Sequence, residues 1–384
     1  MKIIIAPDSF KGSLAAPDVC RAVKKGVLAV FPGADVTELP LADGGEGTME
    51  SMVRASGGQF IQREVRGPLG EPVRAAFGVL GDGETAVIEM AQASGLTLVA
   101  DGERNPLTAS SFGTGELIQA ALDLGYRKFI VGIGGSATND AGTGMLKALG
   151  MRFFDSRGAE LGEGGGDLGR LAHIDGSGFD ERIAEADFLV ASDVRNPLCG
   201  PDGASAVFGP QKGATPEMVR VLDAALHHFA EVTHRQTGKE LRAYPGGGAA
   251  GGMGAALIAF LDAELRPGIG LVLESLDFAA EIRDADLIIT GEGRLDAQTL
   301  EGKVVAGVAE AARSSGVPVI ALAGSQNLSF AQLRQIDLLS AFSIVSGPCS
   351  VEMAMEQAEQ LLTEKASMVL SVMRPGLLSA PPDA

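Results

Sequence analysis

Short apolar runs alternate with amphipathic stretches at both ends of the chain. Residues 2–6 form a β-branched run, and Val19, Val23 and Val27 then recur at helical spacing after Pro17, which can begin a helix. Near the C-terminus the same alternation predicts strands at 287–290, 319–323 and 344–345 and helices at 304–312 and 350–373. Strands that alternate with helices and are themselves continuous apolar runs are typical of a parallel sheet covered on both faces.

The middle of the chain has a different pattern. Residues 59–65, 73–79 and 85–90 read as consecutive strands joined by Gly-Pro and Gly-Asp-Gly turns. Beyond them the pattern predicts strands at 128–133 and 188–191 and helices at 114–124, 141–149 and 216–237. The change of pattern predicts a second, mixed α/β domain inserted into the first.

We therefore expect an α/β protein of two domains. Residues 1–60 and 285–384 would form a doubly wound, mostly parallel sheet domain of Rossmann or flavodoxin type, and residues 61–284 the inserted mixed α/β domain. The active site is expected in the cleft between them.

Composition narrows the functional classes. A formal net charge of −18 argues against nucleic-acid and anionic-membrane partners. The three cysteines are far apart and form no CxxC pair, which favours neither a disulfide framework nor a zinc site. No stretch reaches the ~20 apolar residues of a membrane helix, so we expect a cytoplasmic protein. The oligomeric state stays open, and a homo-oligomer is compatible with the sequence.

Polar, glycine-rich loops follow five of the expected strands. They comprise residues 8–13, 43–47, 134–140, 193–196 and 291–296. Because ligands of open α/β sheets bind outside the carboxyl ends of the strands, these loops are expected to converge on one site. The alternative is that they are ordinary turns, in which glycine, asparagine and aspartate are common.

The loop after residue 133 is a candidate phosphate site. Gly134 and Gly135 let backbone N–H groups approach a phosphate, and Ser136, Thr138 and Asn139 add donors.

The same stretch also fits a GxGxxA dinucleotide fingerprint. The matching residues are Gly132, Gly134 and Ala137, with Asp155 as the ribose-binding acid. An NAD-dependent dehydrogenase is therefore the alternative enzyme. The P-loop, protein-kinase, HExxH and GxSxG motifs are absent.

Seven motifs in one order resemble the type 1 bacterial glycerate kinase family, and the likeness runs from the N-terminus to about Ala323. They are residues 6–12, 41–48, 134–142, 193–198, 208–214, 248–252 and 290–296. The resemblance implies ATP-dependent phosphorylation of D-glycerate to 2-phosphoglycerate, with Mg²⁺ as cofactor. One departure is Val305, where the family usually carries proline.

Phosphoryl transfer needs positioning and neutralisation of charge more than covalent chemistry. The catalytic candidates are Lys11, Asp193 and Asp296, with Asp193 and Glu292 as metal ligands. Expected substrate-binding residues are Asp8, Ser9, Asp43, Arg195, Lys212 and Arg294. Whether Asp43 or Glu46 faces the substrate stays open. The alternatives are capping roles for the acids and solvated surface positions for the cations, and a nucleotide-binding sensor without catalysis is the third hypothesis.

Overall fold

The computed structural model describes residues 1–45 and 47–373, and it divides into two compact units. Unit 1 is formed by Met1–Asp43 and Ile269–Ala384, and unit 2 by Gly44–Gly268. The divisions lie earlier in the chain than the expected ones near residues 60 and 284. The reason is local packing, because helix α2 (Thr48–Ala55) contacts strands of unit 2 and helix α10 (Phe278–Glu281) contacts a helix of unit 1.

Unit 1 contains a five-stranded parallel sheet. Its strands are β1 (Lys2–Ile5), β2 (Asp35–Glu38), β11 (Leu287–Leu295), β12 (Val319–Gln326) and β13 (Ser340–Ser343), in the order β13-β12-β11-β1-β2. The chain leaves β1 for β2 on one side, whereas β11 is followed by β12 and β13 on the other. The strand order therefore reverses between β1 and β11, which is where open α/β sheets bind ligands.

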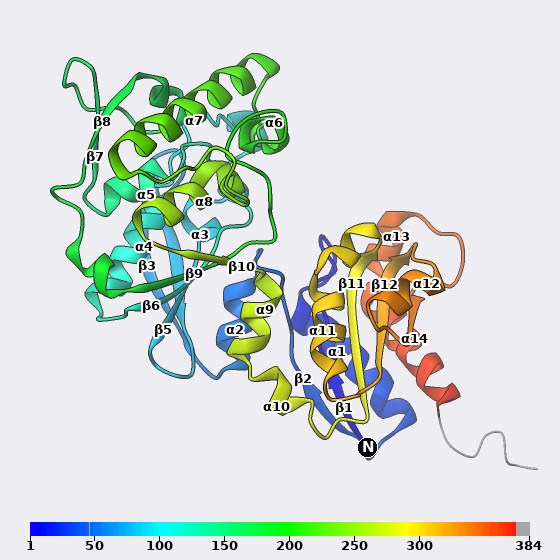
Figure 1. The fold of residues 1–384 in the computed structure, drawn as a ribbon. Helices are drawn as coiled ribbons and strands as arrows, with labels where there is room; N and C mark the ends of the chain where they lie inside the picture. The colour runs from blue at the N-terminus through cyan, green and yellow to red at the C-terminus, as the bar shows by residue number, and fades with distance from the viewer. Residues whose placement is uncertain (46, 374–384) are drawn as a thin grey trace, which may run out of the picture. The chain divides into compact units, whose positions relative to one another are not determined.

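The helices of unit 1 bury the apolar runs of its strands. They are α1 (Ala16–Val30), α9 (Gly268–Ser275), α10, α11 (Val304–Arg313), α12 (Phe330–Gln335), α13 (Val351–Glu356) and α14 (Ala358–Val372). Helices α1 and α14 lie side by side (Figure 1) and share a core with Ile3 and Ile5 of β1. Helix α11 contacts β11 and β12.

Unit 2 contains a six-stranded mixed sheet. Its strands are β3 (Gln59–Arg66), β4 (Pro72–Val79), β5 (Thr85–Glu89), β6 (Lys128–Gly132), β9 (Asp187–Ala191) and β10 (Glu264–Arg266), in the order β10-β9-β6-β5-β4-β3. Strands β3, β4 and β5 pair antiparallel, and β5, β6, β9 and β10 pair parallel. A separate antiparallel pair is formed by β7 (Arg152–Asp155) and β8 (Leu171–Asp175).

The helices of unit 2 surround one large apolar core. They are α2, α3 (Ala91–Ser94), α4 (Phe112–Asp123), α5 (Thr143–Ala148), α6 (Ala204–Phe208), α7 (Pro216–Thr237) and α8 (Ala249–Phe260). The predicted α/β class, with parallel and mixed sheets, is confirmed. No helix in the described part of the chain is long and apolar enough to cross a membrane.

Several predicted elements differ from the structure, among them the strands predicted at 287–290 and 319–323, which continue to Leu295 and Gln326. The last strand is Ser340–Ser343 and not 344–345, because the half-buried edge strand carries a weaker apolar signal than the residues after it. The predicted helix 350–373 is two helices, α13 and α14, that meet at Gln357. Helix α5 begins at Thr143 because Ala141 and Gly142 have positive φ angles of 53° and 68°.

Candidate functional site

A pocket of about 1060 Å³ lies in unit 1, and several of the predicted site residues line it. They are Asp8, Ser9, Lys11, Asp43, Glu292, Arg294 and Asp296. They follow β1 and β2, or lie in the last part of β11 or directly after it. Backbone hydrogen bonds join these segments, since Asp8 N–H donates to the Gly291 carbonyl at 2.8 Å and Leu41 N–H to that of Pro7 at 2.9 Å. Of the five segments expected to converge, these three do so in unit 1, whereas the convergence of the other two with them stays a prediction.

Asp8 and Glu292 are two buried carboxylates, one in the loop after β1 and the other in the neighbouring strand β11. Their exposed fractions are 6% and 7%. Burial, followed by the negative charge of Asp43, raises the pKa of Asp8 to about 6. Burial also raises the pKa of Glu292 to about 7, with smaller contributions from Asp8 and Asp43. Carboxylates with such pKa values can accept or release a proton near neutral pH.

Each of these carboxylates is held by a hydrogen bond. The Ser9 backbone N–H donates to Asp8 Oδ1 at 2.6 Å, and the Thr299 hydroxyl donates to Glu292 Oε1 at 2.6 Å. The interacting negative charges of Asp8, Asp43 and Glu292 would be relieved by a cation in the pocket.

The acids of unit 1 are chemically suited to a magnesium–nucleotide complex. Mg²⁺ is commonly bound through one or two carboxylates together with the phosphates of the nucleotide. Among residues 1–45 and 47–373, no three His, Cys, Asp or Glu side chains are close enough to hold a metal ion by themselves. Glu292, one of the two predicted metal ligands, has the oxygen chemistry that such a complex requires.

Lys11 supplies positive charge to the same pocket. Its side chain is exposed, and it lowers the pKa of Asp8, against the effect of burial. The loop that carries it is tied down at Ser13, whose hydroxyl donates to the Met355 carbonyl at 2.7 Å. Lys11 can therefore approach an anionic ligand without breaking the packing of the loop.

Asp296 has a structural role in addition to its predicted catalytic one. Its carboxylate caps the short helix Ala297–Glu301 by accepting from Gln298 N–H at 2.9 Å, and it pairs with Arg294 at 3.0 Å. The capping alternative thus has direct structural support, whereas the catalytic role stays a prediction.

In unit 2 the loop after β6 is buried and braced. Lys212 is 2% exposed, and its Nζ donates to Ser136 Oγ and to the Thr138 carbonyl, both at 2.6 Å. Burial lowers the pKa of Lys212 to about 7. The Asn139 amide donates to Ser205 Oγ at 3.0 Å. Lys212 therefore positions the loop, and its expected contact with substrate stays a prediction.

Close packing explains why residue 134 is a glycine, and no bound phosphate is needed for this explanation. A Cβ atom at Gly134 would lie 2.8 Å from the Gly45 Cα. The loop also pairs with residues before it, since Ala137 N–H donates to the Ser94 carbonyl at 2.9 Å and Leu96 N–H to that of Gly135 at 2.8 Å. Phosphate binding by Gly134, Gly135, Ser136, Thr138 and Asn139 stays a prediction.

The dinucleotide-binding interpretation lacks its ribose acid. Asp155 ends β7, which pairs with β8 in a separate sheet and not with β6. A ribose-binding acid is expected at the end of a strand that neighbours the fingerprint strand in the same sheet. The dehydrogenase alternative is therefore not favoured.

The remaining predicted residues of unit 2 lie in the exposed segment after β9. Asp193 and Arg195 are both exposed, and Asp193 Oδ1 accepts a hydrogen bond from Gly268 N–H at 3.1 Å. Glu46, which was considered beside Asp43, lies outside the described residues. The roles of Asp193 and Arg195 stay predictions.

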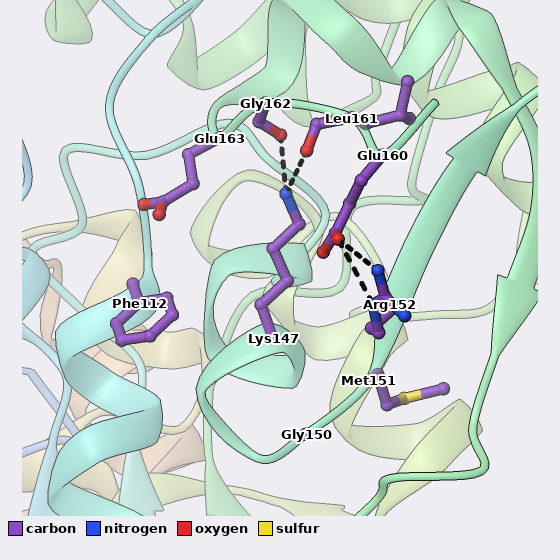
Figure 2. Close-up of a pocket in the computed structure, with 9 residues that line it drawn as sticks. All are labelled: Phe112, Lys147, Gly150, Met151, Arg152, Glu160, Leu161, Gly162 and Glu163. Atoms are coloured by element: carbon purple, nitrogen blue, oxygen red, sulfur yellow. Dashed lines mark hydrogen bonds and ion pairs between the residues drawn. The ribbon is translucent and has the colours of Figure 1, made fainter. Parts of the chain in front are cut away.

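A second pocket, of about 530 Å³, lies elsewhere in unit 2 and contains none of the predicted site residues. Figure 2 shows the Lys147 ammonium between the carbonyls of Leu161 and Gly162, with the Arg152–Glu160 ion pair beside it. The two Lys147 hydrogen bonds measure 2.6 and 2.7 Å. This side chain fastens the segment after β7 to helix α5.

Replacing Lys147 by methionine is expected to lower the free energy of unfolding by about 1–2 kcal/mol, because two carbonyl groups lose their donor. Thermal unfolding of the purified variant measures this. Arg152→Met is the matched control in the same pocket, since its ion pair is largely exposed and contributes about 0–1 kcal/mol. Equal stability of Lys147→Met and wild type would refute the fastening role.

The structure adds pocket residues that the sequence analysis did not name. Gln298 and Lys303 lie after β11, and residues 324–327 and 343–351 form the ends of β12 and β13 and the segments that follow them. The signal for the last group was Gly347-Pro348, a loop dipeptide. The apolar pair Ile344-Val345 predicts a strand at a place where the loop has already begun. The loop residues on either side of Gly347-Pro348 therefore do not stand out in the sequence as pocket residues.

Known proteins match this chain over nearly its whole length. The model of the glycerate kinase family matches residues 3–374. The chain belongs to the glycerate kinase family. A glycerate kinase from Bacillus subtilis is 54% identical over 95% of this chain and 96% of that protein. A glycerate 2-kinase from Escherichia coli is 47% identical over 99% of this chain and 100% of that protein.

A solved structure agrees with this family assignment. The crystal structure of putative glycerate kinase 2 from Salmonella typhimurium has a TM-score of 0.87 and 49% identity, covering 98% of this chain and 99% of that one. The predicted resemblance to glycerate kinases is confirmed, and the chain is an enzyme of the kinase class.

Proposed function

We propose that the protein transfers the γ-phosphoryl group of ATP to D-glycerate and forms 2-phosphoglycerate, with Mg²⁺ as cofactor. The observation that carries the proposal is the unit 1 pocket, in which buried Asp8 and Glu292 lie with Asp43 and Lys11 at the carboxyl ends of three strands. The names of the relatives support glycerate as substrate, and that of the E. coli relative supports the 2-phosphate.

In the proposed reaction a hydroxyl oxygen of glycerate forms a bond to the γ-phosphorus. The bond from that phosphorus to the β–γ bridging oxygen breaks, and ADP leaves. The hydroxyl proton passes to Asp8, whose pKa of about 6 leaves it ionised at neutral pH and able to accept. When bound, Mg²⁺ neutralises charge on the phosphates.

The other residues of the pocket serve binding in this proposal. Glu292 would hold Mg²⁺, while Lys11 and Arg294 neutralise the phosphate and carboxylate anions. Ser9 and Asp43 line the pocket and would contact the substrate. Asp193 and Asp296 stay predicted catalytic or metal-binding residues, and the cleft between two domains stays a predicted location.

An assay for ADP release tests the function. Turnover is expected only when both D-glycerate and ATP are present, and it should stop when EDTA removes Mg²⁺. Enolase, added without phosphoglycerate mutase, should consume the product if it is the 2-phosphate. No ADP release with D-glycerate would contradict the proposal, and a product inert to enolase would contradict the position of the phosphate.

Asparagine variants test the two catalytic roles carried over from the sequence. Asp193→Asn and Asp296→Asn are each expected to lose most of kcat, with glycerate and ATP saturating. Asparagine caps helices about as well as aspartate, so Asp296→Asn should keep the melting temperature of wild type. A variant that keeps both stability and kcat would remove its residue from the catalytic group.

A further inference from the structure

The unit 1 pocket is larger than a three-carbon acid requires. Its volume of about 1060 Å³ slightly exceeds the range of about 300–1,000 Å³ that is typical of sites for drug-sized ligands. A nucleotide is a ligand of that size class, whereas glycerate fills only a small part of such a space. The pocket therefore has room for a nucleotide as well as for glycerate.

The charged and the apolar residues that line the pocket come from different segments of the chain. All the acids that line it are Asp8, Asp43, Glu292 and Asp296, and its cations are Lys11, Arg294 and Lys303. The segment after β13 contributes instead the apolar residues Ile344, Val345, Pro348, Val351 and Met355, with Ser346, Cys349 and Ser350 between them.

Hydrogen bonds anchor this apolar wall, which consists of those residues of segment 344–355 that line the pocket. The Ser343 hydroxyl donates to the Gly324 carbonyl at 3.1 Å, and Val345 N–H donates to Ser343 Oγ at 3.2 Å. At the other end of the wall, the Ser13 hydroxyl binds the Met355 carbonyl at 2.7 Å, which joins the wall to the Lys11 loop. The wall is thus preformed.

Two side chains of the wall expose apolar surface to the pocket side of the unit. Val351 is 69% exposed and Met355 is 37% exposed, although both are large and apolar. An aromatic base that covers such side chains removes apolar surface from water from both partners. Glycerate, a small polar anion, gains nothing there, because no cation lies among the lining residues of the wall.

We propose that the apolar wall binds the base and ribose of the nucleotide, with the phosphates directed toward Lys11, Arg294 and Lys303. This assignment rests on the proposed kinase function. It names the nucleoside contacts, for which the sequence predicted no residues, and it leaves the charged lining residues for the reacting groups.

Cys349 offers a direct probe, because it is exposed and lines the wall, whereas Cys20 is buried and Cys199 is half-buried. In a Cys199→Ser background, N-ethylmaleimide should label Cys349, and saturating MgADP should slow that labelling several-fold. Glycerate alone should leave the rate unchanged. Equal labelling rates with and without MgADP would overturn the assignment.

Matched variants on α13 supply a second readout. Val351→Asp places a carboxylate on the wall and is expected to raise the Kd for MgADP about tenfold, measured by calorimetry. Met353→Asp is the control on the same helix, since Met353 is 50% exposed and does not line the pocket. Its Kd should match that of wild type, and equal affinities of Val351→Asp and Met353→Asp would also overturn the assignment.

The failures of the two proposals are distinguishable. If wild type does not phosphorylate D-glycerate with ATP, the kinase proposal fails whatever the labelling shows. If wild type is active but Cys349 is not protected and Val351→Asp binds MgADP normally, the kinase proposal stands and the nucleoside assignment fails.

Discussion

Asp8→Asn is expected to lower kcat by about two to four orders of magnitude, the usual contribution of a general base. Asparagine keeps the oxygen that accepts from Ser9 N–H, so the loop after β1 should retain its conformation. It cannot take up the hydroxyl proton of glycerate. Steady-state kinetics with both substrates saturating measures the loss.

The same substitution should stabilise the protein at neutral pH. The folded-state pKa of Asp8 is about 6, above its ordinary value of 3.8, so ionisation costs more in the folded state than in the unfolded state. Stability is therefore lost as pH rises from about 4 to about 6, by at most about 3 kcal/mol at 1.36 kcal/mol per pH unit. Asp8→Asn should not show this loss, because asparagine does not ionise.

Thermal unfolding at two pH values checks whether Asp8→Asn raises or lowers the stability of the protein. At pH values near 4 the variant and wild type should have similar melting temperatures, whereas near pH 7.5 the variant should unfold at the higher temperature. Asp35→Asn is the matched control, because Asp35 is exposed at the start of β2, and it should change neither kcat nor stability. Full activity of Asp8→Asn would contradict the role of Asp8 as base.

Lys212→Met is expected to change how the stability of the protein depends on pH. The pKa of Lys212 is about 7 in the folded state, below its ordinary value of 10.5, because burial disfavours the ammonium. The unfolded chain therefore binds the extra proton above pH 7, and the stability of wild type rises with pH in that range. The methionine variant lacks this contribution.

The difference between the two proteins is measured by urea unfolding. From pH 7 to pH 9 wild type should gain about 2–3 kcal/mol relative to Lys212→Met. Lys128→Met is the control, since Lys128 is exposed and pairs with Glu84 at the surface. A constant difference between wild type and Lys212→Met over this range would contradict the buried, proton-releasing state of Lys212.

The sequence predicted those site residues that lie at the carboxyl end of an apolar strand. Asp8 and Glu292 could be predicted because each stands in or beside a continuous apolar run, and parallel strands bring their carboxyl ends to one edge. The wall after β13 could not be predicted in the same way. Strand β13 is half-buried along its whole length, so its pattern is weak, and the apolar Ile344 that follows it was taken for the strand.

Side-chain roles were less predictable than positions. Lys212 and Asp296 were both chosen for their charge, yet one braces a buried loop and the other caps a helix. These roles depend on partners distant in the sequence, such as Ser136, 76 residues away from Lys212. In the loop after β6, close packing of the backbone accounts for Gly134, so glycine there did not by itself indicate a ligand.

The central claim is that the unit 1 pocket holds the reacting phosphate. A crystal structure of the protein with D-glycerate, Mg²⁺ and a non-hydrolysable ATP analogue tests it most directly. We expect the γ-phosphate beside Lys11, Mg²⁺ on Glu292 and a glycerate hydroxyl oxygen within hydrogen-bonding distance of Asp8. An analogue bound with its γ-phosphate away from Asp8, Lys11 and Glu292 would contradict the account.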